Sequence, residues 1–267
     1  MDISTYFFAL GVILAAGVVA WAVSIVIRNV AFVDSLWSLF FLVAAVVFAA
    51  SVETLGARGA LVLALVIIWA LRLSLYITAR NWGAPEDYRY RQIRANNEPF
   101  WIRSLYLVFG LQGVLAWFIA MPLLPAITQG GGLGVLEIAA ALLWLTGFAF
   151  EAGGDYQLAK FKADPDNQGR VMDRGLWRYT RHPNYFGDFC IWWAFYLFAV
   201  SAGAWWTIAS PILMSFLLLK VSGVAMLERT ITERRPEYAN YIARTNAFFP
   251  GPPKDSQDGN SVREVRS

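Results

Sequence analysis

The chain has 267 residues, of which 58% are hydrophobic and 15% charged, whereas a soluble domain of this size carries about 25% charged residues. The mean hydropathy is +0.48, so the excess apolar side chains must face a medium other than water. The net charge of +3 gives no argument for nucleic-acid binding. One histidine and one cysteine exclude an intramolecular disulfide and argue against a zinc or haem centre.

Seven apolar runs, each near the length of about 20 residues that crosses a bilayer, predict an all-α polytopic membrane protein. They cover residues 6–27, 31–51, 59–78, 104–126, 134–153, 185–201 and 205–227. The first run is too long for a removable signal peptide and lacks a convincing cleavage site after it, so we expect it to remain as a helix. We expect residues 1–250 to form a single seven-helix domain. The Pro- and charge-rich residues 251–267 should form a disordered cytoplasmic tail.

Basic residues are distributed unequally between the connections. Arg28, the connections 79–103 and 155–184, and the stretch after the last run carry most of them, whereas the opposite connections carry only Arg58. By the positive-inside rule this asymmetry predicts an N-terminus outside and a C-terminus in the cytoplasm, and it supports seven helices rather than six. No internal repeat is evident, which weakens a transporter interpretation.

The second and third runs carry charged and phenolic groups inside apolar sequence. Asp34 lies near the start of the second run, and Arg72 and Tyr76 lie four residues apart on one face of the third. An intramembrane carboxylate is a functional candidate, and in a dry site Asp34 would stay protonated and donate a hydrogen bond. A structural Asp34–Arg72 pair is the alternative, and the two interpretations are compatible. Trp37 is close enough to Asp34 to contact a substrate.

The connection between the fifth and sixth runs holds the densest set of polar side chains. Lys162, Arg170 and Arg174 suit phosphate oxygens. An ordered cluster follows, and its amide and carboxylate suit an amide or a ribose. The members of this cluster are Tyr179, Arg181, His182, Asn184 and Asp188. The positive-inside rule alone would also explain the charge, but not the cluster.

Two further stretches each allow more than one interpretation. Residues 85–100 begin Pro-Glu-Asp-Tyr-Arg-Tyr, which suits either a cover over a nucleotide or a helix at the membrane interface. Glu228 and Arg229 follow the seventh run, where a structural helix end is the default interpretation.

Three motifs resemble the steroid 5-alpha-reductase family, its bacterial members in particular. They are RYTRHPNYFGD at 178–188, EDYRY at 86–90, and EYANY at 237–241 with FFP at 248–250. The resemblance extends over nearly the whole chain. Members of that family are membrane reductases that take hydride from NADPH and reduce a carbon–carbon double bond conjugated to a carbonyl. The resemblance implies a site open to the cytoplasm in a bacterial inner membrane, and a lipophilic enone such as a 3-oxo-Δ4-steroid as substrate.

Carried over position by position, the resemblance implies NADPH contacts at Asp155, Lys162, Arg170, Tyr179, Asn184 and Asp188. Further cofactor candidates are Arg174, Arg181, His182, Glu228 and Arg94. The catalytic carboxylate of the family falls at Asp34. Tyr76 is the nearest tyrosine to its partner, although an alignment on Arg72 puts Trp69 there, so Trp37, Trp69 and Arg72 are substrate candidates. Asp34 and Tyr76 would stabilise the negative charge that builds on the carbonyl oxygen when hydride reaches the β-carbon.

Membrane methyltransferases of the isoprenylcysteine and phospholipid types resemble the Arg-His-Pro-x-Tyr segment too, and they bind S-adenosylmethionine. They usually carry paired glutamates after the last helix, whereas this chain has Glu228 followed by Arg229. Their cofactor has no phosphates to occupy the basic connection, so both points favour NADPH. The sequence is also compatible with a reductase of another conjugated lipid and with a non-enzymatic transporter or receptor. We expect a monomer that binds neither metal nor nucleic acid.

Overall fold

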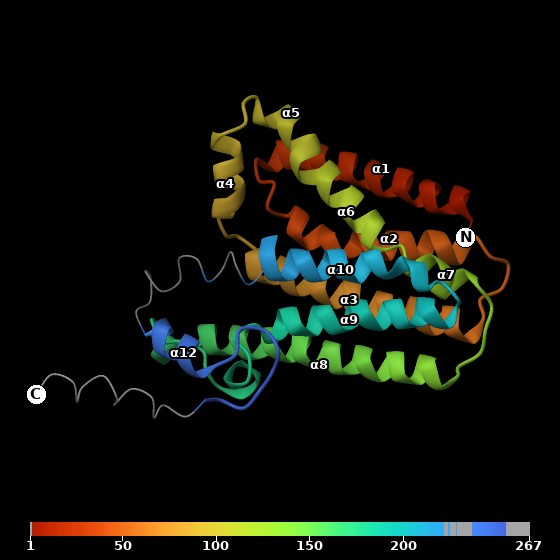
Figure 1. Ribbon diagram of the computed structural model, residues 1–267. Coiled ribbons are helices and arrows are strands. Elements are labelled where there is room, and N and C mark those ends of the chain that lie inside the picture. Colours follow the sequence, from red (N-terminus) through yellow and green to blue (C-terminus); the bar gives the residue numbers. More distant parts are fainter. Residues whose placement is uncertain (1, 222–223, 225–227, 229–236, 255–267) are drawn as a thin grey trace, which may run out of the picture. The chain divides into compact units, whose positions relative to one another are not determined.

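The computed structural model describes residues 2–221, 224, 228 and 237–254 (Figure 1). It is 76% helical, and no strand occurs in these described ranges. The chain divides into two compact units, residues 1–140 with 194–211 and residues 141–193 with 212–267. The predicted disordered tail lies, from residue 255 onward, outside the described residues.

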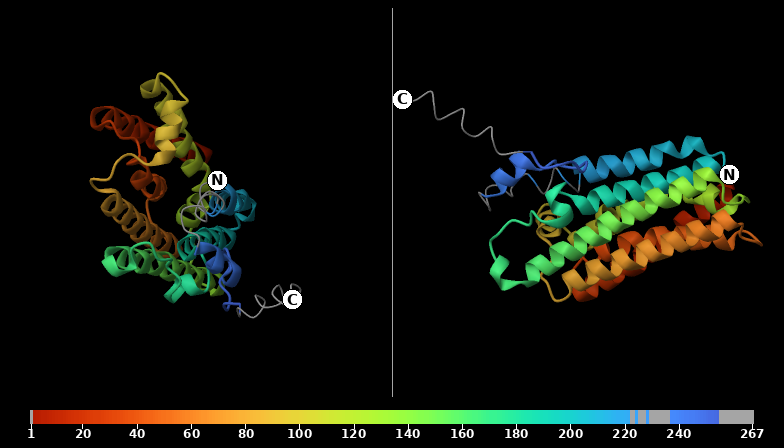
Figure 2. Two further views of the ribbon diagram at one scale, coloured as in Figure 1. Left: turned by 90° about the vertical axis from the view of Figure 1, so that its left-hand side faces the viewer. Right: turned by 90° about the horizontal axis from the view of Figure 1, so that it is seen from below.

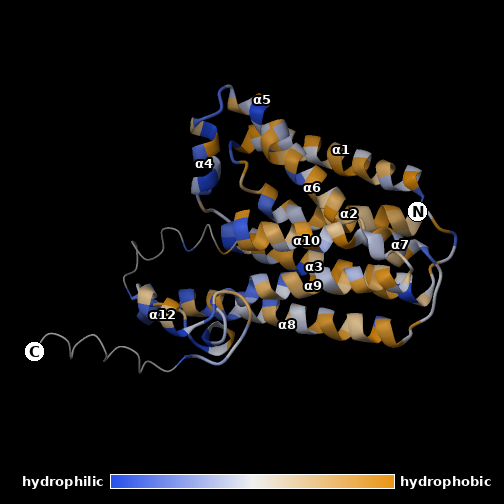
Figure 3. Cartoon of the chain, in the orientation of Figure 1, coloured by the Kyte–Doolittle hydropathy of each residue, from blue (hydrophilic) through white to orange (hydrophobic). Residues whose placement is uncertain are grey.

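Five helical segments among the described residues are long and apolar enough to cross a membrane. They are α1 (Ile3–Ile27), α2 (Val33–Ala50), α3 (Ala57–Asn81), the segment Phe100–Ile119 and α8 (Val135–Ala163). The fourth segment is continuous through α5 (Phe100–Ser104), η1 (Leu105–Gly110) and α6 (Leu111–Ile119), and η1 is a π-helix. Five of the predicted runs are thus confirmed as candidate spans, and Figure 3 shows the apolar residues that cover them.

The last two predicted runs are helical but are not among these five candidate spans. The sixth forms α9 (Pro183–Ser201). The seventh begins as η4 (Trp205–Ile208), α10 (Ala209–Phe216) and η5 (Leu217–Val221), and residues 222–223 and 225–227 lie outside the described part. A count of seven spans, with the N-terminus outside, therefore stays a prediction.

The first unit packs its spans through small residues and aromatic rings. A Cβ atom at Gly59 of α3 would overlap the carbonyl oxygen of Ile127, so α3 and α7 (Leu123–Thr128) meet backbone to backbone. Trp69 is fully buried on α3, and its ring lies 5.7 Å from that of Phe41 on α2. On the outer surface α1 leaves apolar side chains such as Val26 largely exposed. Such a surface suits lipid rather than water.

Arg58 forms a buried hub at the start of α3. Its guanidinium donates to the carbonyl oxygens of Ala126, Gln129 and Gly130, and lies 3.5 Å from a carboxylate oxygen of Glu137. The Arg58 side chain is only 4% exposed, so its charge is desolvated and is balanced inside the protein. The one basic residue of the opposite connections thus fastens three elements of the first unit together.

The connection between the third and fourth predicted runs contains α4 (Tyr88–Ala95). Figure 1 shows α4 running across the direction of α1 and α2, as a surface helix would. Asp87 caps α4 by accepting from the N–H of Arg89 at 2.9 Å. Tyr90 faces the core while Tyr88 and Arg91 are exposed. The structure therefore confirms a helix in this connection, and its location at a membrane interface stays a prediction.

In the second unit α8 and α9 lie side by side (Figures 1 and 2). A Cβ atom at Gly187 of α9 would overlap the backbone nitrogen of Glu151 and the carbonyl oxygen of Gly147 on α8. This close approach brings the polar ends of both helices together. The α8 helix continues ten residues beyond the predicted end at 153, because hydropathy marks where apolar sequence stops and not where backbone hydrogen bonding stops.

Candidate functional site

The first of two polar centres surrounds Asp34, in the first turn of α2. The phenol of Tyr90 donates to Asp34 Oδ1 at 2.5 Å, and Arg89 Nη2 donates to Oδ2 at 2.8 Å. The amide of Gln112 on α6 donates in turn to the Tyr90 oxygen at 3.2 Å. Two side chains of α4 thus contact a carboxylate of α2, and a side chain of α6 contacts one of these two.

A second ion pair fixes the start of α4. Glu86 accepts two hydrogen bonds from Arg94, at 2.8 and 3.1 Å, and another from the backbone N–H of Val30 at 3.0 Å. Burial of Glu86 opposes ionisation, but the contacts to Arg94 and Val30 outweigh it and lower the pKa of this carboxyl. Arg94, a candidate for cofactor phosphate, is engaged here within the first unit, and its guanidinium lies 4.1 Å from the centre of the Phe100 ring.

The structure places the other candidates of the first unit on α2 and α3. Trp37 stacks edge-on against Phe41 at 5.1 Å, and Phe41 in turn contacts the buried Trp69. Arg80 lies 5.9 Å from the ring centre of Tyr76. Roles for Tyr76, Arg72, Trp37 and Trp69 at a substrate stay predictions.

Sequence reasoning did not assign Arg89 and Tyr90 to Asp34. The motif Glu-Asp-Tyr-Arg-Tyr at 86–90 was the available signal, since its aromatic and basic residues precede a helix. Nothing in the sequence shows that this helix returns to the second span, because the partners are more than 50 residues apart.

The second polar centre is built around Glu228. Arg181 donates to both of its carboxylate oxygens, at 2.7 and 2.9 Å, and His182 Nε2 lies 3.0 Å from Oε1. Arg181 also donates to the carbonyl oxygens of Ile242 and Thr245. Arg181 and His182 are 7% and 3% exposed. Arg181, His182 and Glu228, three of the predicted cofactor ligands, therefore contact one another. Their side chains form hydrogen bonds within the protein.

The carboxyl of Glu228 titrates far below its usual range. Burial raises its pKa, but hydrogen bonds from His182 and Arg181, with the Arg181 charge, outweigh burial and lower the pKa to about 2. A carboxyl whose pKa is lowered by folding stabilises the fold above its ordinary pKa and loses that contribution as pH falls toward the lowered value. The contribution is therefore complete above a pH of about 4.5 and lost toward about 2.

We expect wild-type protein to lose more stability than Glu228→Gln over this acid window. The difference should be no more than about 2 kcal/mol after solvent screening of the partly exposed pair. Melting temperatures of both proteins in detergent, measured at steps from pH 7 to 3, test this. Parallel curves for the two proteins would show that the ionised Glu228 carboxylate and its partners add nothing to the stability of the fold.

A backbone frame holds the segment 179–182 against the chain after α12 (Tyr238–Arg244). The N–H of Arg181 donates to Asn246, and the N–H of Gly251 donates to Tyr179, at 2.9 and 3.0 Å. The hydroxyl of Thr180 donates to the carbonyl of Phe248 at 2.8 Å, and the Tyr241 hydroxyl donates to the carbonyl of Trp177. The motifs at 178–188, 237–241 and 248–250 thus form one structure, in which Thr180 and Tyr241 are structural residues that the sequence did not single out.

A partly buried amide and a buried carboxylate face each other between α8 and α9. Asn184, in the first turn of α9, donates from Nδ2 to Asp155 Oδ1 at 3.2 Å, and Asp155 is only 5% exposed. Pro183 occupies the first position of α9, as a residue without an N–H can. Asp188 lies one turn further along α9, partly buried. Roles for Asp155, Asn184 and Asp188 at a cofactor stay predictions.

The basic connection between α8 and α9 exposes its cations. Lys160, Lys162, Arg170, Arg174 and Arg178 are all exposed, as is Tyr179 at 46%. They outnumber the acidic side chains of the same stretch. Arg174 donates to Asn167 at 3.3 Å and lies 5.7 Å from the Phe161 ring centre. Exposed guanidinium and ammonium groups can bind phosphate oxygens, and a role at a cofactor stays a prediction for these cations. In the described residues no group of three or more His, Cys, Asp or Glu side chains is arranged to hold a metal ion.

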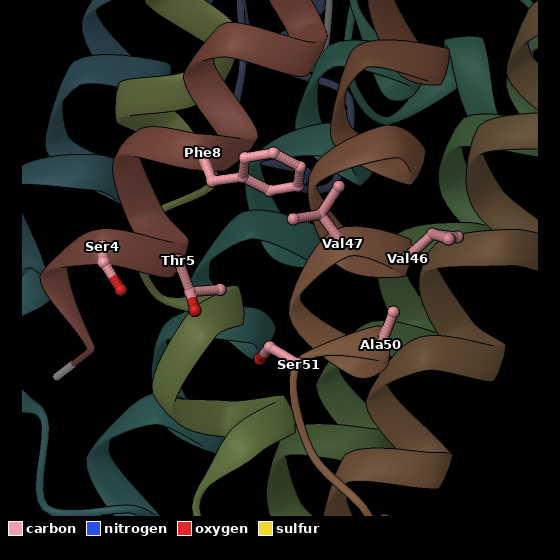
Figure 4. A pocket seen from close by; sticks show the side chains of 7 residues that line it. All are labelled: Ser4, Thr5, Phe8, Val46, Val47, Ala50 and Ser51. Carbon is pink, nitrogen blue, oxygen red and sulfur yellow. The ribbon is translucent and has the colours of Figure 1, made fainter.

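A groove of about 540 Å³ opens between the first turns of α1 and the last turns of α2 (Figure 4). It is lined by Ser4, Thr5, Phe8, Val46, Val47, Ala50 and Ser51. None of these side chains is charged, and Asp34 lies at the other end of α2. The groove therefore offers no charged side chain that could act as an acid or a base.

Comparison with known proteins gives a family and a relative for this chain. Residues 20–245 match a family described as "Protein of unknown function (DUF1295)". An uncharacterized protein of Schizosaccharomyces pombe, C594.04c, is 28% identical over 91% of this chain and 79% of its own length. No solved structure matches.

Proposed function

Since the chain belongs to the DUF1295 family, which includes steroid 5-alpha-reductase-like membrane proteins, we propose that it is a membrane-embedded, NADPH-dependent reductase. The reaction proposed is reduction of a carbon–carbon double bond conjugated to a carbonyl. The first choice of substrate is a 3-oxo-Δ4-steroid, and another lipophilic enone or enoyl lipid is the alternative within the same chemistry.

One observation supports the proposal: the hydrogen-bonded Asp155–Asn184 pair and a run of exposed cations both belong to the stretch in which α8 ends and α9 begins. The Asp155–Asn184 pair is costly in an apolar bundle, which is typical of groups kept for binding. Lys162, Arg170 and Arg174 suit the phosphates of NADPH, a charge that S-adenosylmethionine does not carry. The donor set of this unit therefore fits NADPH better than the methyltransferase cofactor.

The roles of the chain's own residues follow from their chemistry. NADPH would supply the hydride when bound. Lys162, Arg170 and Arg174 would hold its phosphates, while Asp155 and Asn184 would accept from and donate to its amide or ribose groups. Arg181, with His182 and Glu228, would keep the segment 179–184 in place. Asp34 and Tyr76 would act on the carbonyl oxygen, where a preorganised donor is worth about 3 kcal/mol in rate.

Ligand-dependent melting of the purified protein tests the cofactor independently of turnover. We expect NADPH to raise the melting temperature and S-adenosylmethionine to leave it unchanged. Arg170→Ala should weaken NADPH binding about tenfold, the loss of about 1.4 kcal/mol. Arg103→Ala, which removes an exposed arginine of α5, is the matched control and should bind as the wild type does.

A substrate panel then separates the reductions. NADPH oxidation is followed with progesterone or testosterone, with an enoyl thioester and with a polyprenol. Stabilisation by S-adenosylmethionine instead of NADPH would favour a methyltransferase, and stabilisation by neither would refute the proposed function.

A further inference from the structure

We propose that exposed arginines around the start of α4 bind the headgroup of an anionic phospholipid. The α4 surface, as we call it, consists of five exposed residues of the first unit: Arg28, Arg80, Trp82, Tyr88 and Arg91. This inference does not depend on the proposed reductase activity. It adds a lipid ligand to the NADPH and the enone of that activity.

The ends of two spans place arginines at the border of exposed apolar surface. Val26 and Ile27, at the end of α1, are exposed, and Arg28 follows them directly. Leu75 of α3 is exposed too, and Arg80 lies in the last turn of the same helix. Exposed apolar side chains suit hydrocarbon, so an arginine where such a surface ends lies at the depth of lipid headgroups.

The α4 helix divides its side chains between two faces. Tyr90 and Ile93 pack with Phe100 in a buried apolar cluster of the first unit. Tyr88 and Arg91, three residues apart and therefore on one face, are exposed. Figure 1 shows α4 running across the direction of α1 and α2. A helix with this division and direction suits the headgroup layer, where its outer face meets lipid phosphates.

Other arginines occupy the carboxylates around α4. Asp34 and Asp87 both accept from Arg89, at 2.8 and 3.0 Å. Glu86 accepts from Arg94 at 2.8 Å, and the Glu86 side chain is only 11% exposed. Hydrogen bonds within the protein thus engage these three carboxylates, and positive charge remains on the exposed arginines of the α4 surface.

The three arginines of the α4 surface surround one short segment. Burial opposes ionisation of Glu86, but its hydrogen bonds outweigh burial, and the charge of Arg91 helps to lower its pKa. Burial opposes ionisation of Asp87 as well, but its hydrogen bonds outweigh burial, and the charge of Arg80 helps to lower its pKa. Glu86 also accepts from the backbone N–H two residues after Arg28, at 3.0 Å. Arginines of α1, α3 and α4 therefore lie around the same two neighbouring carboxyls.

An anionic phospholipid matches this surface in charge and in shape. Guanidinium groups suit phosphate oxygens, and each arginine near an anionic membrane surface adds about fivefold to binding. Trp82, which is 83% exposed, and Tyr88 suit the level where headgroups meet acyl chains. A zwitterionic headgroup carries its own cation beside the phosphate, and a free phosphate has no chains for Trp82 to contact. Both should therefore bind more weakly.

Native mass spectrometry of the full chain in detergent tests the proposal by measuring the affinity of the first lipid bound. We expect phosphatidylglycerol to bind at least about tenfold more tightly than phosphatidylcholine. Arg91→Gln should weaken phosphatidylglycerol binding about fivefold and change phosphatidylcholine binding less than about twofold. Arg91→Lys keeps the charge and should lose less than Arg91→Gln. Arg178→Gln, which removes an exposed cation of the second unit, is the matched control and should bind both lipids as the wild type does.

A protein that combines Arg28→Gln, Arg80→Gln and Arg91→Gln should lose the preference for phosphatidylglycerol. Equal affinity of the wild type for the two lipids, or a preference that persists in the triple variant, would overturn the proposal. Displacement of phosphatidylglycerol by millimolar glycerol phosphate would also overturn it, since the site would then take a free phosphate and not a lipid. If the triple variant fails to fold, the Arg91→Gln and Arg91→Lys pair decides alone.

Discussion

Gly187→Ala is expected to prevent the protein from folding into its native bundle. The new methyl group would overlap the backbone nitrogen of Glu151 and the backbone oxygen of Gly147. Neither contact is with a flexible side chain, so α8 and α9 would have to separate. Separation would pull apart Asp155 and Asn184 as well, and we expect a loss of more than about 4 kcal/mol.

Size-exclusion chromatography and thermal unfolding in detergent measure this effect. Gly11→Ala is the control, since its Cβ would meet nothing within 4 Å and alanine favours a helix. It should melt at the wild-type temperature or slightly higher. Native yield and melting temperature for Gly187→Ala equal to those of Gly11→Ala would mean that α8 and α9 do not pack backbone to backbone.

Arg181→Ala should produce the second largest loss, about 3–5 kcal/mol, because it leaves a partly buried carboxylate without its bidentate partner. Four hydrogen bonds disappear together, two to Glu228 and one each to the carbonyls of Ile242 and Thr245. Arg181→Lys keeps the charge but cannot satisfy the same fork, so it should recover only part of the stability. Thermal unfolding of the purified variants measures both.

Arg178→Ala is the matched control for this experiment, since Arg178 lies three residues earlier and is exposed. It should change stability by less than about 0.5 kcal/mol. An Arg181→Ala protein that keeps wild-type stability but loses NADPH-dependent stabilisation would assign Arg181 directly to the cofactor instead of to the fold.

Hydropathy alone predicted the long helices well, because the length of an apolar run is set by the thickness of the bilayer. The extension of α8 to Ala163 was missed for the same reason, since its last turns are polar. Asp34 was recognised as unusual because a carboxylate in apolar sequence needs a partner. The partners themselves, Arg89 and Tyr90, were not recognised, since only folding brings α4 back to α2.

The region 178–188 is a second place where the sequence alone was not sufficient. Its polar residues were identified as a group from their density. The sequence could not show which of these residues bond within the protein and which are exposed at its surface. The structure makes this division: Arg181 and His182 are engaged with Glu228, whereas Tyr179 and Arg178 are exposed. The side-chain partners of Arg181 and His182 described above lie 46 to 64 positions away along the chain, which composition does not encode.

The burial of the Arg58 side chain bears on which basic residues can influence the orientation of the chain in a membrane. A guanidinium that is 4% exposed cannot meet lipid headgroups, so it does not act as an anchor at that end of the first unit. The positive-inside rule depends on Lys and Arg side chains that the insertion machinery and the lipid headgroups can contact. An arginine that is neutralised by Glu137 and three carbonyls contributes only while the chain is unfolded. In the mature protein the charge imbalance between the two ends of this unit is therefore larger than the sequence suggests.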